Sequence, residues 1–104
     1  LNQQRLIVTD RITTARRQRV RLTWQLGEGW EVTPTDKGWT LTRGTLTVIV
    51  KLAEELRWSV VTGRAGEEPA GWIVRGGAVR EAPAFVGEGE LDGPFEIESS
   101  FEVR

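Results

Sequence analysis

The sequence contains no cysteine, no histidine and no tyrosine. The lack of cysteine excludes disulfides, thiolate nucleophiles and cysteine-bound metals. The lack of histidine removes the most common general base and metal ligand, and the lack of tyrosine removes the phenol as an acid or base. Most acidic residues fall on alternating strand positions that are typical of a solvated face. We therefore predict that this chain is not an enzyme by itself, with no catalytic residue, no metal and no cofactor.

Methionine and long apolar runs are also missing. A natural chain needs an initiator methionine, so we expect residues 1–104 to be processed or, as the favoured interpretation, to be a C-terminal fragment of a larger protein. The length is typical of one domain. No stretch approaches the roughly 18 apolar residues of a membrane span, and no signal-peptide pattern opens the chain. The sequence therefore predicts a single domain without a membrane span.

The charge is nearly balanced overall but unevenly distributed. The net charge is −1, which gives no bulk attraction to nucleic acid or to a membrane surface. Six arginines and one acid lie in residues 1–21, whereas seven acids lie in residues 81–104. The favoured interpretation is that these two ends pair across the fold or only solubilise different edges. The alternative is a basic strip that faces an acidic ligand.

Apolar residues recur with a period of two along most of the chain, as in half-buried antiparallel strands. The runs RVRLTWQL (19–26), TLTVIVKL (45–52) and FEIESSFEV (95–103) show this alternation most clearly. Glycine, proline and charged residues separate the runs, and the segment GEGELDGP (87–94) has the composition of a turn. The pattern predicts an all-β protein, an antiparallel two-sheet β-sandwich of about eight or nine short strands.

The stretch GWIVRGGAVREAPAFV (71–86) differs from these regular strands. It combines a tryptophan, a glycine pair, basic residues and a proline ahead of a second apolar run. We interpret it as a connection between the two sheets, in which Trp72 anchors the start and Pro83 introduces the next strand. Gly76 and Gly77 would permit the tight bend between them.

Two features are candidates for a ligand site. Trp72 is the tryptophan most open to an exposed position, and exposed aromatic rings stack on the apolar faces of sugars. Arg17, Arg19 and Arg21 would point to one face of a strand, where guanidinium groups can hold carboxylates or sulfates. The structural alternatives are that Trp72 pins a connection to the core and that the arginines protect a sheet edge.

The order of the segments resembles the C-terminal β-sandwich region of the heparinase II/III-like polysaccharide lyases. The matching segments are RRQRVRLTWQLGEGWEV, GWTLTRGTLTVIV, RWSVVTG and the ending that starts at GWIVRGG. The matched positions in that ending are Gly71, Trp72, Arg80, Pro83, Phe85, Val86 and the glycines of 89–93. The family usually has an aromatic residue where this chain has Ile73 and the glycine pair.

The resemblance implies a parent protein that cleaves uronic-acid-containing polysaccharides by β-elimination. It also implies a bacterial parent that is periplasmic or secreted. The catalytic acid and base of the family are tyrosine and histidine, so no catalytic residue carries over to this chain. The resemblance thus implies a non-catalytic accessory domain whose partner is the catalytic domain of the parent chain.

Three functions remain open at this point. An accessory domain predicts an apolar patch where the catalytic domain packs. A stand-alone carbohydrate-binding module for acidic polysaccharides predicts an exposed Trp72 beside converging arginines. A generic protein-interaction sandwich predicts neither feature.

Overall fold

The computed structural model describes residues 4–13, 16–36 and 38–104, and within these ranges it contains strands and no helix. The strands are β1 (Gln4–Ile12), β2 (Arg17–Gln25), β3 (Glu31–Thr35), β4 (Gly38–Arg43), β5 (Leu46–Lys51), β6 (Arg57–Thr62), β7 (Trp72–Arg75), β8 (Ala78–Glu81), β9 (Pro83–Asp92) and β10 (Phe95–Val103). The all-β prediction is confirmed, with ten strands in place of about eight or nine.

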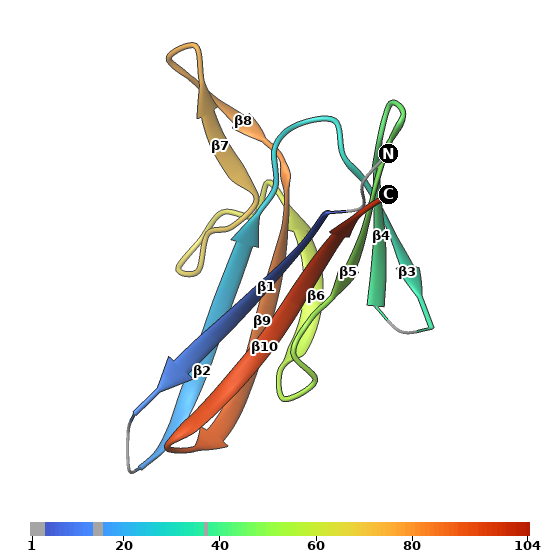
Figure 1. Cartoon of the computed structure of the whole chain (residues 1–104). Coiled ribbons are helices and arrows are strands. Elements are labelled where there is room, and N and C mark those ends of the chain that lie inside the picture. The colour runs from blue at the N-terminus through green and yellow to red at the C-terminus, as the bar shows by residue number, and fades with distance from the viewer. Residues whose placement is uncertain (1–3, 14–15, 37) are drawn as a thin grey trace.

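The strands form a sandwich-like arrangement of antiparallel sheets (Figure 1). One sheet has five strands in the order β1-β10-β5-β4-β3, and a second has three strands in the order β2-β9-β6. The chain crosses between these two sheets after β1, β2, β5 and β9, whereas β3, β4 and β5 follow one another within the five-stranded sheet. Pro34 lies on the edge strand β3, as expected for a residue that has no backbone N–H to donate.

The core lies between the five-stranded and three-stranded sheets. One cluster joins Val20 of β2 to Ile97 of β10, and a second joins Leu41 and Val50 to Phe85 of β9. Aromatic rings link the layers, because Trp24 of β2 meets Phe101 of β10 edge-on with ring centroids 5.3 Å apart. Side chains that alternate along each strand therefore meet between the layers, as the period of two predicted.

The prediction of a turn over residues 87–94 was wrong. β9 continues to Asp92, and its residues 84–92 pair with β2 from one end of β2 to the other. It is the central strand of its sheet, and its residues 84–87 are buried. Gly87 and Gly89 occupy inward positions that neighbouring side chains fill, because a β-carbon at Gly87 would meet Trp58 and one at Gly89 would meet Leu56. Only the last two residues of the predicted turn lie outside the strand.

The expectation that residues 71–86 connect the two sheets was also wrong. This segment lies between β6 and β9, which are neighbours in the same three-stranded sheet. β7 and β8 pair as a separate hairpin, which projects from one end of the molecule (Figure 1). Gly76 and Gly77 form its tip with φ angles of 59° and 77°. The glycine pair does make the tight bend, but inside a hairpin whose two-residue turn needs positive φ at both positions.

Candidate functional site

The arginine row of β2 lies opposite an acidic row on β9. Arg17, Arg19 and Arg21 pair in register with Asp92, Glu90 and Glu88 respectively. Arg17 contacts Glu90 at 3.2 Å and Asp92 at 3.4 Å, and Arg21 contacts Glu88 at 3.6 Å. Alternation along a strand places all three arginines on one face, as predicted. The favoured interpretation of the uneven charge is confirmed here, since arginines near the start of the chain pair with acids near its end.

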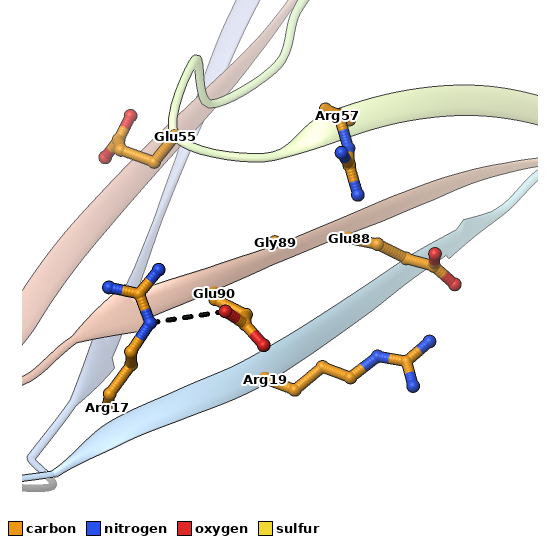
Figure 2. Close-up of a pocket in the computed structure, with 7 residues that line it drawn as sticks. All are labelled: Arg17, Arg19, Glu55, Arg57, Glu88, Gly89 and Glu90. Carbon is orange, nitrogen blue, oxygen red and sulfur yellow. Dashed lines mark hydrogen bonds and ion pairs between the residues drawn. The ribbon is translucent and has the colours of Figure 1, made fainter.

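A shallow hollow of about 550 Å³ lies beside this row. Its lining residues are Arg17, Arg19, Glu55, Arg57, Glu88, Gly89 and Glu90. β9 runs between Arg57 of β6 on one side and the arginines of β2 on the other (Figure 2). The lining contains three arginines and three glutamates, so the hollow has polar groups of both signs and no net excess of positive charge.

The arginines of the hollow differ in how closely acids neutralise them. Arg17 is held by two carboxylates, whereas the contact of Arg19 with Glu68 is 3.8 Å long. Arg57 lies opposite Glu88 in the strand register, with no close ion pair described between them. A carboxylate or sulfate entering the hollow would therefore meet Arg19 and Arg57 as its most available donors. Sequence reasoning missed Arg57, because a single arginine at a strand start carries no signal until the register is known.

Trp72 lies at the base of the β7–β8 hairpin and is half-buried. Its indole N–H donates a hydrogen bond of 2.7 Å to the carbonyl oxygen of Arg64. Neither Trp72 nor Arg21 lines the hollow that Arg17 and Arg19 border. The structure thus brings two of the predicted ligand residues into one hollow and places Trp72 in a hydrogen bond that holds the segment between β6 and β7.

Gly71 is the last residue of the segment between β6 and β7. Its carbonyl oxygen accepts hydrogen bonds from the N–H groups of Gly63 and Ala82, at 2.9 and 3.0 Å. Its φ is +79°, and a β-carbon there would lie 2.6 Å from the carbonyl oxygen of Val61. A glycine is therefore needed both for the backbone conformation and for the close approach of β6.

An apolar surface lies at the end of the five-stranded sheet. Leu6, Leu46 and Val103 are 60%, 50% and 37% exposed, and the strand registers place them on the face that is buried further along the sheet. We call these three residues the apolar end. The start of β1, the end of β10 and the β4–β5 turn lie together at this end of the sheet (Figure 1). The inner face is thus left uncovered at one end.

No group of three or more acidic, histidine or cysteine side chains is placed to hold a metal ion in the part of the chain that the structure describes. Among those same residues, no helix is long and apolar enough to cross a membrane.

Comparison with known proteins yields no match, whether to family models, to curated proteins or to solved structures.

Proposed function

We propose that this chain is a non-catalytic accessory β-sandwich domain of a polysaccharide lyase similar to the heparinase II/III-like enzymes. Its partner is the catalytic domain of the parent chain, which would cleave uronic-acid-containing polysaccharides by β-elimination. The segment order described above supports the proposal, together with the absence of histidine and tyrosine from the sequence. The acid and base of the reaction would both belong to the catalytic domain.

The apolar end is the observation that carries this proposal. Three large aliphatic side chains on one sheet face are at least 37% exposed there, next to the half-buried Phe101. Exposed apolar surface of this kind is typical of a site where another protein surface packs. The hydrophobic contribution of covering it would stabilise the contact between the two domains.

The test compares the full product of the reading frame that encodes this chain with residues 1–104 alone and with substituted variants of both. The full product should form unsaturated uronate from heparin, heparan sulfate or alginate, whereas residues 1–104 alone should form none. Leu46→Asp and Val103→Asp should lower the thermal stability of the full product without changing the unfolding midpoint of the isolated chain. Val74→Asp and Val79→Asp are matched controls, because these residues are also exposed but lie on the hairpin. The proposal would be contradicted if the full product had no elimination activity. It would also be contradicted if the substitutions in the apolar end and those in the hairpin lowered its thermal stability equally.

A second candidate function is binding of acidic polysaccharides in the hollow. Arg19 and Arg57 support it, because both border the hollow and the ion pair of Arg19 with Glu68 is long, at 3.8 Å. Titration of the isolated chain with heparin, followed by tryptophan fluorescence, tests it. Saturable binding that survives moderate salt favours the binding module, whereas binding that disappears with modest salt contradicts it.

A further inference from the structure

The four edge strands of the two larger sheets differ in how well they are protected against pairing with another strand. β3 carries Pro34, β2 carries Arg17, Arg19 and Arg21 in its first half, and β6 has six residues. β1 has nine residues, contains no proline and pairs on one side only, with β10, among the described residues. Proline, arranged charges and short length are the usual means of blocking edge-to-edge pairing. β1 carries Arg5, Asp10 and Arg11 near its ends, whereas its middle residues 6–9 contain neither a charge nor a proline.

β1 also exposes apolar side chains on both of its faces. Leu6 is 60% exposed on the inner face, and Ile7 is 49% exposed on the outer face. On the inner side, Leu6, Phe101 and Val103 line a hollow of about 560 Å³ together with Gln4 and Arg5. A strand added at this edge would gain backbone hydrogen bonds and would also cover apolar surface, which are the two components of binding by strand addition.

We propose that β1 pairs antiparallel with β1 of a second copy of this chain, about a twofold axis at Ile7. In such a pair, residues at equal distances before and after Ile7 face one another across the two copies. Two facing side chains point to the same side of the sheet. The axis at Ile7 places Ile7 opposite itself, Leu6 opposite Val8 and Arg5 opposite Thr9. Gln4 then faces Asp10, which gives an amide and a carboxylate that can form a hydrogen bond.

Charge and the matching of apolar side chains favour this register over its neighbours. An axis at Val8 would place Arg5 opposite Arg11 twice, and like charges directly opposite one another destabilise a pair. The same axis would place the apolar Leu6 opposite Asp10. An axis at Leu6 would place the apolar Ile7 opposite the charged Arg5 and Val8 opposite Gln4. The register at Ile7 pairs residues 4–10 without opposing like charges.

The pairing joins two five-stranded sheets into one continuous sheet through their β1 edges. It covers Ile7 on the outer face and brings Val8 of each copy beside Leu6 of the other on the inner face. A second copy therefore forms hydrogen bonds with the exposed edge and covers both exposed side chains. This inference does not depend on the proposed catalytic partner, because it concerns the isolated chain.

Cysteine scanning of the isolated chain tests the pairing directly, because the natural sequence has no cysteine. Single cysteines at positions 5–10 are oxidised mildly, and the rate of disulfide-linked dimer formation is measured. Ile7→Cys should react at least about tenfold faster than Arg5→Cys or Thr9→Cys, because directly opposed β-carbons in an antiparallel pair lie about 4.5–5.5 Å apart. Leu46→Cys and Val74→Cys measure the rate of random collision at exposed positions.

A maximum at Leu6→Cys or Val8→Cys overturns the proposed register, and equal rates at all positions overturn the pairing itself. A reversible measurement complements the scan. Sedimentation of the unmodified chain should show a dimer that grows with concentration, and Ile7→Arg should abolish it while Val74→Arg leaves it unchanged. Circular dichroism of both variants checks that they fold. A chain that stays monomeric at all concentrations overturns the proposal, whatever the outcome for the catalytic partner.

Discussion

The indole ring of Trp58 lies directly on Gly87, its partner in the β6–β9 register. A β-carbon at Gly87 would come within 2.8 Å of the Cδ2, Cε2 and Cε3 atoms of the ring. The same indole donates its N–H to the carbonyl oxygen of Ala53 at 2.7 Å, which fixes the ring in place. Gly87 is therefore a packing residue of the central strand, and the ring can move aside only by breaking that hydrogen bond.

Replacing Gly87 with alanine should destabilise the protein by about 1–3 kcal/mol, the usual cost of overpacking a well-filled core. Chemical denaturation followed by tryptophan fluorescence measures the free energy of unfolding. Gly27→Ala is the matched control, because the nearest atom to a β-carbon there lies 3.9 Å away. Equal stability of the two variants would show that Trp58 does not constrain Gly87.

The same contact explains why β9 could not be predicted from the sequence. Glycine is disfavoured in strands in general, so the alternation of glycine and acid over residues 87–90 indicated a turn. Here the two glycines face large side chains from β6 and from the turn before it. Whether a glycine makes a turn or leaves space for a neighbour depends on that neighbour, which is distant in the sequence. β2 and β10 were predictable because most of their inward positions hold large apolar residues. These show the alternation without any knowledge of a distant neighbour.

Ser99 provides a second test of the core. It interrupts the inward apolar row of β10 and is 2% exposed. Its hydroxyl oxygen accepts a hydrogen bond of 3.2 Å from the backbone N–H of Ala53 in the turn between β5 and β6. Ser99→Ala should lower the free energy of unfolding by about 1–3 kcal/mol, because the buried N–H loses its partner.

Ser59→Ala is the control for that measurement, since Ser59 is exposed and its hydroxyl is 3.5 Å from the carbonyl oxygen of Val86. Its effect should stay within about 0.5 kcal/mol. A similar loss in both variants would mean that the bond to Ala53 adds nothing beyond a surface hydroxyl.

Trp72 should act as an anchor of the segment between β6 and β7. Trp72→Phe keeps an aromatic ring but removes the N–H that bonds to Arg64, and should cost about 1 kcal/mol. Trp72→Ala should cost about 2–4 kcal/mol, somewhat less than for a fully buried tryptophan. Limited proteolysis should then cut within residues 63–71 sooner than in the unmodified chain. Unchanged stability together with loss of sugar binding would instead assign Trp72 to a ligand site.

Only the part of the candidate site that depends on strand alternation could be predicted from the sequence. The period of two places Arg17, Arg19 and Arg21 on one face, and the structure agrees. Their acidic partners depend on the β2–β9 register, which is set by packing between distant segments and cannot be read from either strand. Arg57 joins the same hollow from a third strand for the same reason. The charge pattern of the sequence indicated pairing between the two ends but not which residues meet.

Because the hollow carries charges of both signs, substitutions can either raise or lower its affinity for acidic polysaccharides. Glu90→Gln removes a carboxylate that holds Arg17 and gives the lining a net positive charge, so heparin affinity should rise about two- to fivefold at low salt. Arg19→Gln should lower it by a similar factor. Glu102→Gln is the control, because its carboxylate contacts Arg104 outside the hollow. Fluorescence titration at two salt concentrations measures all three variants. If Glu90→Gln and Glu102→Gln shift the affinity equally, the effect reflects net charge alone and the hollow is not the binding site.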